Sequence, residues 1–276
     1  MFQENTQNFN RLIAAVAEMP EVMSVGKSGS AALPKAGEGD IDIFVFCDTV
    51  PGIQKRQAAA ESLDVAFTEI HLSASPGKHW GTCDYVFFGG MEVCLMYFPI
   101  AGIDAEMEST LSGARPNRED NYFYPTGRCA SFVTMHILCD KQGYLAAMQK
   151  RLRVYPETLA ARLIRYHLEA LKDPEDLERA VSRKDALFYH FALDLALDHF
   201  LQALFALNRC YFPSRMRTVL LIESFSRKPE RCAERILEAV ALGASGGTLS
   251  QSYQEFSALC RELAALSRRS LALYPE

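Results

Sequence analysis

The sequence predicts an α+β protein in which a small α/β domain with a mixed sheet precedes an all-α helical bundle domain. Two observations support this prediction. Runs of β-branched and aromatic residues alternate with helical patterns in the first part of the chain, whereas almost everything beyond that part has helical periodicity. Pro125 and Gly127 lie where the change occurs. We therefore expect one domain over residues 1–126 and a helical C-terminal domain over residues 127–276.

The first domain should begin with an amphipathic helix that Pro20 ends. Runs rich in valine, isoleucine and aromatic residues then indicate strands, and an intervening segment rich in alanine, glutamine and glutamate indicates a helix. Gly89-Gly90 predicts a hairpin between the last two strands. In chain order we expect a helix over 8–19, strands over 22–25 and 41–46, a helix over 53–63, strands over 66–72, 85–88 and 92–98, and a helix over 103–111.

The second domain is predicted to be a series of helices separated by prolines and glycines. The segment over 186–207 is apolar and long enough to span a bilayer, but it contains Asp194 and Asp198. Because each aspartate would cost roughly 2.5–3.5 kcal/mol at the centre of a membrane, we expect a buried helix of a bundle instead. The expected helices cover 130–139, 143–153, 157–172, 175–182, 185–208, 229–242 and 252–272.

The overall composition limits the class of protein. Hydrophobic residues make up 49% and charged residues 23% of the chain, which is typical of a globular protein and excludes a disordered one. The net charge of −5 disfavours a nucleic acid partner, because proteins that bind its backbone carry a basic surplus. The polar N-terminus lacks the apolar stretch of a signal peptide, and the eight cysteines form no CxxC pair. We expect reduced thiols, a cytoplasmic location and no membrane segment, and a homodimer is left open.

Two aspartates carry the strongest chemical signal. Asp40 and Asp42 flank Ile41 at the start of an apolar strand, and because side chains alternate along a strand, both carboxylates should point to the same face. Neighbouring carboxylates repel each other unless a cation lies between them, and Mg²⁺ or Mn²⁺ prefers such oxygen ligands. Glu92 on a later strand is the candidate third ligand, with Glu69 as its competitor. The alternative is a set of solvated strand residues.

Gly29 and Ser30 form the candidate phosphate site, separated from Asp40 by nine residues. Glycine lets a phosphate approach the backbone closely, and a serine offers both a hydroxyl and an N–H. The preceding Gly-Lys-Ser run looks like the end of a P-loop, but Glu21 stands where that motif needs a glycine. A P-loop is therefore rejected.

These motifs together resemble the signature of the DNA polymerase β-like nucleotidyltransferase superfamily, in which Gly-Ser is followed by an Asp-x-Asp strand. Met91-Glu92-Val93 looks like the strand with the third carboxylate in kanamycin nucleotidyltransferase-type proteins, which also have a C-terminal helical domain. The signature covers roughly residues 24–98. The resemblance implies that Asp40, Asp42 and Glu92 hold Mg²⁺ (or Mn²⁺), and that Gly29 and Ser30 bind an NTP, with ATP as the expected one.

The reaction that this resemblance implies is transfer of a nucleoside monophosphate from Mg–NTP to a hydroxyl group, with release of pyrophosphate. The acceptor would be a small molecule or a protein. The rival interpretation is a catalytically inactive relative that acts as a nucleotide sensor or a protein-interaction module.

The helical half should supply further groups. Asp185 is the candidate general base for the acceptor hydroxyl, and the alternative is that it stabilises a helix N-terminus. Arg183, Arg209 and Arg215 are candidate ligands of the triphosphate or pyrophosphate, and the alternative is a solvated basic loop. A polar stripe on the long helix lies either at its solvent face or toward the active site, and it comprises His190, Asp194, Asp198 and Gln202.

Overall fold

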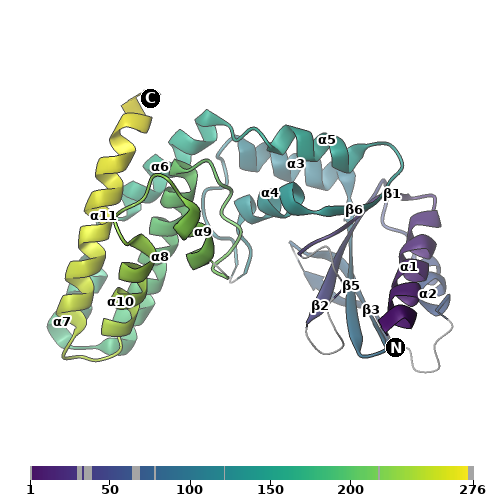
Figure 1. The fold of residues 1–276 in the computed structure, drawn as a ribbon, viewed down its shortest axis with the longest axis horizontal. Coiled ribbons are helices and arrows are strands. Elements are labelled where there is room, and N and C mark those ends of the chain that lie inside the picture. The colour runs from purple at the N-terminus through teal and green to yellow at the C-terminus, as the bar shows by residue number, and fades with distance from the viewer. Residues whose placement is uncertain are drawn as a thin grey trace. The chain divides into compact units, whose positions relative to one another are not determined.

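In the computed structural model the chain forms two compact units (Figure 1). The first unit comprises Met1–Glu108 and Ser131–Val154, and the second comprises Ser109–Ala130 and Tyr155–Glu276. The domain boundary predicted between residues 126 and 127 falls within the helix α4 (Pro125–Thr134) and stays a prediction. The structure describes residues 2–29, 33, 39–63, 69–77, 79–120, 122–216 and 218–272.

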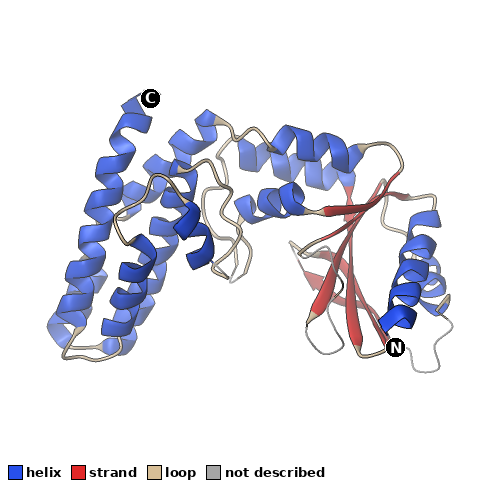
Figure 2. Cartoon of the chain, viewed as in Figure 1, coloured by secondary structure: helices blue, strands red, loops and turns tan. Residues whose placement is uncertain are grey.

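The predicted fold class is confirmed, because a mixed sheet with helices is followed by a helical C-terminal region (Figure 2). The sheet has six strands in the order β3-β4-β5-β2-β1-β6. Its central pair, β2 and β5, is parallel, and the other neighbours are antiparallel. The strands are β1 (Val22–Lys27), β2 (Asp40–Cys47), β3 (Glu69–Gly77), β4 (Gly81–Phe88), β5 (Met91–Pro99) and β6 (His136–Asp140).

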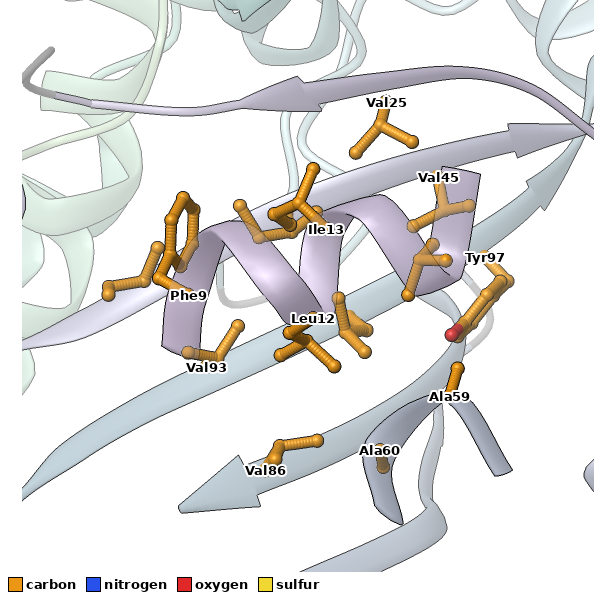
Figure 3. Close-up of a cluster of buried hydrophobic side chains, with 14 of the residues drawn as sticks. Phe9, Leu12, Ile13, Val25, Val45, Ala59, Ala60, Val86, Val93 and Tyr97 are labelled. Atoms are coloured by element: carbon orange, nitrogen blue, oxygen red, sulfur yellow. The ribbon is translucent and has the colours of Figure 1, made fainter. Parts of the chain in front are cut away.

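One face of the sheet is buried against the helices α1 (Phe2–Glu18) and α2 (Ile53–Glu61). Figure 3 shows α1 lying across the strands, with Phe9 and Leu12 directed at the apolar side chains beneath them. The strands contribute alternate residues to this core, among them Val45 and Val93. The intervening residues of β2 and β5 therefore lie on the opposite face.

That opposite face is covered along only part of its length. Near the end of β2, the ring of Phe46 lies 5.2 Å from that of Phe132 in α4 and 5.6 Å from that of Tyr144 in α5 (Tyr144–Leu152). A Cβ on Gly26 of β1 would clash with the side chain of Met135, so a larger residue there would force that side chain to move. At the start of β2, by contrast, Asp40 is exposed and Asp42 is half-buried.

The remaining helices include α3 (Ile100–Leu111), which follows β5 directly, and the bundle of the second unit. Within the bundle, α8 is the most buried element, and α6 and α11 pack against it. No described helix combines the length and the apolar content that a membrane crossing requires. The bundle helices are α6 (Glu157–Ala170), α7 (Glu175–Arg183), α8 (Ala186–Leu207), α9 (Thr218–Ser224), α10 (Cys232–Leu242) and α11 (Leu249–Ala272).

Two elements differ from the sequence prediction. The helix predicted over 130–139 begins earlier, as α4, and its second half is the strand β6. The strand forms because this segment pairs along the edge of β1, which provides hydrogen bonds that a local periodicity cannot reveal. The short helix α9 lies in a region predicted to have no helix.

Candidate functional site

The three predicted metal-binding carboxylates lie on two adjacent strands. β2 and β5 run parallel, with Asp40 beside Glu92 and Asp42 beside Cys94. Residues that pair in this way point to the same face, so Asp40, Asp42 and Glu92 share the face opposite the α1 and α2 core. Adjacent strands are about 4.8 Å apart, which brings the three side chains into one neighbourhood.

The electrostatics of Asp42 reflect this neighbourhood. Burial, followed by the nearby charges of Asp40 and Glu92, raises the pKa of Asp42 to about 6. A cation between the carboxylates would remove this repulsion. The all-oxygen donor set fits Mg²⁺ or Mn²⁺ rather than a soft metal.

The three carboxylates are neighbours on the sheet, but their side chains do not converge on one point. Among the residues that the structure describes, no three His, Cys, Asp or Glu side chains are gathered closely enough to hold a metal ion. Because Asp40 and Glu92 already pair across adjacent strands, convergence requires side-chain rotation and not a change of strand register.

The predicted phosphate loop begins beside these carboxylates. The backbone N–H of Ser28 donates to the carbonyl oxygen of Asp42, with an N···O distance of 3.0 Å, so the chain leaves β1 next to Asp42. Gly29 follows at a φ of 79°, a conformation that favours glycine, and it is exposed. Ser30 lies outside the described residues, so its predicted phosphate contact is not placed.

Two rows of side chains cross four strands on the carboxylate face. Two of their members, Phe87 and Tyr85, are not among the site residues that the sequence predicts. Both are half-buried on β4, where they alternate with the buried residues Val86 and Phe88. Their alternation is visible in the sequence, but only the pairing of β4 with β5 places them beside the carboxylates. The first row is Asp40, Glu92, Phe87 and Glu69, and the second is Asp42, Cys94, Tyr85 and His71.

Neighbouring side chains surround the two rings. Tyr85 pairs with Cys94 across β4 and β5, and the nearby Cys94 thiol, followed by burial, raises the pKa of the Tyr85 hydroxyl to about 12. The imidazole of His71 meets the ring of Phe87 edge-on, with centroids 5.7 Å apart and an interplanar angle of 82°. Glu69, the competitor of Glu92 in the sequence, lies on the edge strand β3, two strands further from β2 than Glu92 does. Its carboxylate lies 2.8 Å from an imidazole nitrogen of His71.

The candidate residues of the helical half lie in the second unit. Asp185 caps α8, because its carboxylate accepts a hydrogen bond from the N–H of Phe188 at 3.0 Å. Arg183 is the last residue of α7. The cap supports the helix-stabilising alternative for Asp185, while the general-base role of Asp185 and the phosphate role of Arg183 stay predictions.

Arg209 and Arg215 are engaged in ion pairs inside the second unit. The guanidinium of Arg209 makes a two-pronged contact with Glu157 and also donates to backbone carbonyls of α8. Arg215 pairs with Asp194 at 2.9 Å and with Asp198 at 2.7 Å. A phosphate bound by either arginine would compete with these carboxylates, and the phosphate roles stay predictions.

Asp198 is the centre of a buried polar group, so the solvent-face interpretation of the α8 stripe is wrong at this position. Its side chain is 7% exposed and accepts hydrogen bonds from the Tyr124 hydroxyl at 2.8 Å and from Arg215, and Arg118 lies 3.1 Å away. Gln202, one turn further along, is also buried. These contacts tie the loop before α4 and the loop before α9 to α8.

Comparisons with known proteins give a family match and a structural similarity. A family model described as a domain of unknown function (DUF4037) matches residues 124–215, about a third of the chain. The chain is similar to the crystal structure of a nucleotidyltransferase-like protein from Exiguobacterium sibiricum, with a TM-score of 0.46, 13% sequence identity, and coverage of 99% of this chain and 78% of that chain. No curated protein matches. Tyr124, Asp198 and Arg215 all lie in the segment that the family model matches.

Proposed function

We propose that this chain is a metal-dependent nucleotidyltransferase, which transfers a nucleoside monophosphate from an Mg–NTP, with ATP as the expected one, to a hydroxyl of a small molecule or protein and releases pyrophosphate. The observation that supports it best is the shared face of Asp40, Asp42 and Glu92 on adjacent parallel strands, together with the raised pKa of Asp42. Close carboxylates that disfavour one another's charge are a common feature of cation sites.

Each residue of the face has a proposed role. Asp40, Asp42 and Glu92 would hold the metal, which supplies charge stabilisation for the transferred phosphoryl group when bound. The exposed backbone at Gly29, next to Asp42, would lie against the phosphates, because a glycine lets them approach closely. The acidic balance of the chain disfavours a nucleic acid acceptor.

A test of this function compares nucleotide binding in the wild type and in Asp42→Asn. Mg–ATP should stabilise the wild type against thermal unfolding, by about 2.7 kcal/mol at 100 times the Kd. With a cell extract as the source of the acceptor hydroxyl, adding the wild type should increase the release of labelled pyrophosphate from ATP labelled in its β- and γ-phosphates. Asp42→Asn should lose both effects because a metal ligand is removed. Asp48→Asn, at an exposed residue directly after the far end of the same strand, is the matched control and should keep both. A wild type that no NTP stabilises with either Mg²⁺ or Mn²⁺ would contradict the proposal.

The interaction-module alternative has one observation in its favour. Leu187, Phe191 and Leu195 recur one turn apart on α8 and are 86%, 58% and 40% exposed. Exposed apolar stripes of this kind mark contact surfaces. If NTP stabilises the protein but no pyrophosphate is released with any acceptor in a cell extract, a nucleotide sensor that uses this stripe becomes the better description.

A further inference from the structure

The carboxylate face continues sideways into a shelf of two aromatic rings. Phe87 pairs with Glu92, and Tyr85 pairs with Cys94, the neighbour of Asp42. Two strand spacings, or about 10 Å, therefore separate the shelf from the β2 aspartates. Both rings are half-buried, and they lie on the face opposite the α1 and α2 core. We call Tyr85 and Phe87 the aromatic shelf.

The order of the strands indicates from which side of the carboxylates the acceptor reaches the NTP. This step rests on the function proposed above, in which the phosphates lie against the backbone at Gly29, just after β1. β1 and β5 flank β2 on opposite sides. In a phosphoryl transfer the attacking and leaving oxygens are roughly in line on opposite sides of the phosphorus. Pyrophosphate leaving on the β1 side therefore requires an acceptor that arrives from the β5 and β4 side, where the aromatic shelf lies.

The chemistry of the shelf restricts what can lie on it. Its rings offer flat apolar surface and an electron-rich face that attracts cations. On the β3 side stands Glu69, whose carboxylate lies 2.8 Å from the His71 imidazole, and on the β5 side stands Glu92, a proposed ligand of the metal. The preference for a positive charge therefore comes from the electron-rich faces of the two rings.

We propose that Tyr85 and Phe87 bind the acceptor, and that this acceptor is a small hydroxyl compound with a flat ring and a positive charge. Its hydroxyl oxygen forms a bond to the α-phosphorus of the NTP. The bond between that phosphorus and the bridging oxygen of pyrophosphate breaks, pyrophosphate keeps the electron pair, and the hydroxyl proton passes to solvent.

The test uses three probes that separate ring from charge. Tyramine has a ring, a hydroxyl and an ammonium group, ethanolamine lacks the ring, and 4-hydroxyphenylacetate replaces the ammonium with a carboxylate. Their Kd values are measured by equilibrium dialysis with Mg²⁺ and α,β-methylene-ATP, which cannot transfer its nucleotide. Tyramine should bind about tenfold more tightly than either comparison probe, as one aromatic contact implies. With ATP in its place, label from the α-phosphate should appear on tyramine.

Variants assign the binding to the shelf. Phe87→Leu and Tyr85→Leu should each weaken tyramine binding about tenfold and leave that of ethanolamine unchanged, and Phe87→Tyr should restore it. Tyr122→Leu, at a ring in the second unit that is 80% exposed, is the control and should bind tyramine like the wild type. Circular dichroism melts check that each variant folds.

Two results would overturn the inference in different ways. Equal Kd values for the three probes, or wild-type tyramine binding by Phe87→Leu, would remove the aromatic shelf from acceptor binding. If Mg–ATP still stabilises the protein in that case, the proposed function stands. If Mg–ATP gives no stabilisation, the proposed function and the acceptor site fall together.

Discussion

At the scale of single residues, the charged form of Asp42 destabilises the folded protein. Burial and two neighbouring carboxylates hold its pKa at about 6, above the ordinary value of 3.8. The folded state therefore keeps a proton that the unfolded chain releases, and the stability that this proton provides is present below pH 3.8 and lost as the pH rises through 6. A bound cation would compensate for this cost, which is how binding sites commonly differ from the rest of a fold.

Asp42→Asn should therefore stabilise the metal-free protein at pH 7.5. Removing the charge should raise the free energy of unfolding by about 2 kcal/mol at pH 7.5 and change it little at pH 4. Urea denaturation in the presence of EDTA measures both values, with Asp48→Asn as the control. An Asn variant no more stable than the wild type at pH 7.5 would show that Asp42 is not under the strain described.

His167 imposes the opposite pH dependence. Its Nδ1 lies 2.9 Å from that of His199, so the pair links α6 to α8 through one shared hydrogen bond. Burial, and then the charge of His199, lowers the pKa of His167 to about 3. Since the unfolded chain takes up a proton near pH 6.5 and the folded one does not, stability is present above pH 6.5 and lost as the pH falls toward 3.

His167→Gln should reduce the loss of the free energy of unfolding that accompanies falling pH. Between pH 6 and 4, the wild type should lose about 1.4 kcal/mol per pH unit for the one proton involved, and the variant should lose less. Urea denaturation at three pH values measures the slope. His190→Gln, elsewhere on α8, should keep the wild-type slope, and an unchanged slope in His167→Gln would assign the acid sensitivity to other groups.

At the scale of the element, α2 is fastened to the sheet by a buried charge. Arg56 forms an ion pair with Asp84 of β4, and their side chains are 5% and 1% exposed. The guanidinium also donates to the carbonyl oxygen of Pro51 and the hydroxyl of Ser73, both at 3.0 Å, and lies 5.3 Å from the ring centroid of Tyr97. Apart from Arg56, the buried residues of this helix are the small Ala59 and Ala60, so Arg56 provides the largest buried side chain that attaches it to the sheet.

Asp84→Ala should destabilise the protein by about 3–5 kcal/mol, because it leaves the Arg56 charge buried without its partner. The double variant Arg56→Met with Asp84→Leu should lose less, since neither charge remains. Guanidinium chloride denaturation of the single and double variants gives the coupling between the two sites. A cost below about 1 kcal/mol for Asp84→Ala would mean that water reaches Arg56.

Elements were predictable where their own periodicity decided them. The strand of Asp40 and Asp42 and the long helix α8 follow from apolar patterns within each segment. β6 could not be predicted, because its strand conformation depends on pairing with β1, more than a hundred positions earlier in the chain. Sequence patterns record the local preference of a segment, and tertiary pairing overrides it.

At the scale of the whole molecule, the same limit applies to the candidate site. Alternation along one strand placed Asp40 and Asp42 on one face, but the aromatic shelf emerged only from the pairing of β4 with β5. Arg209 and Arg215 are candidate phosphate ligands because of their charge. The carboxylates that pair with them lie on α6 and α8, and the pattern of neighbouring residues does not reveal these pairs. Charge alone does not distinguish a free guanidinium from a paired one.

The parallel pairing of β2 with β5 has a consequence for folding kinetics. Parallel neighbours need a long crossover, and here the chain passes through α2, β3 and β4 before Glu92 meets Asp40. The closure of such a distant pair is slow and comes late. Repulsion among the carboxylates therefore arises only in nearly native species, so the extra stability of Asp42→Asn should appear as slower unfolding in stopped-flow measurements, with the refolding rate unchanged.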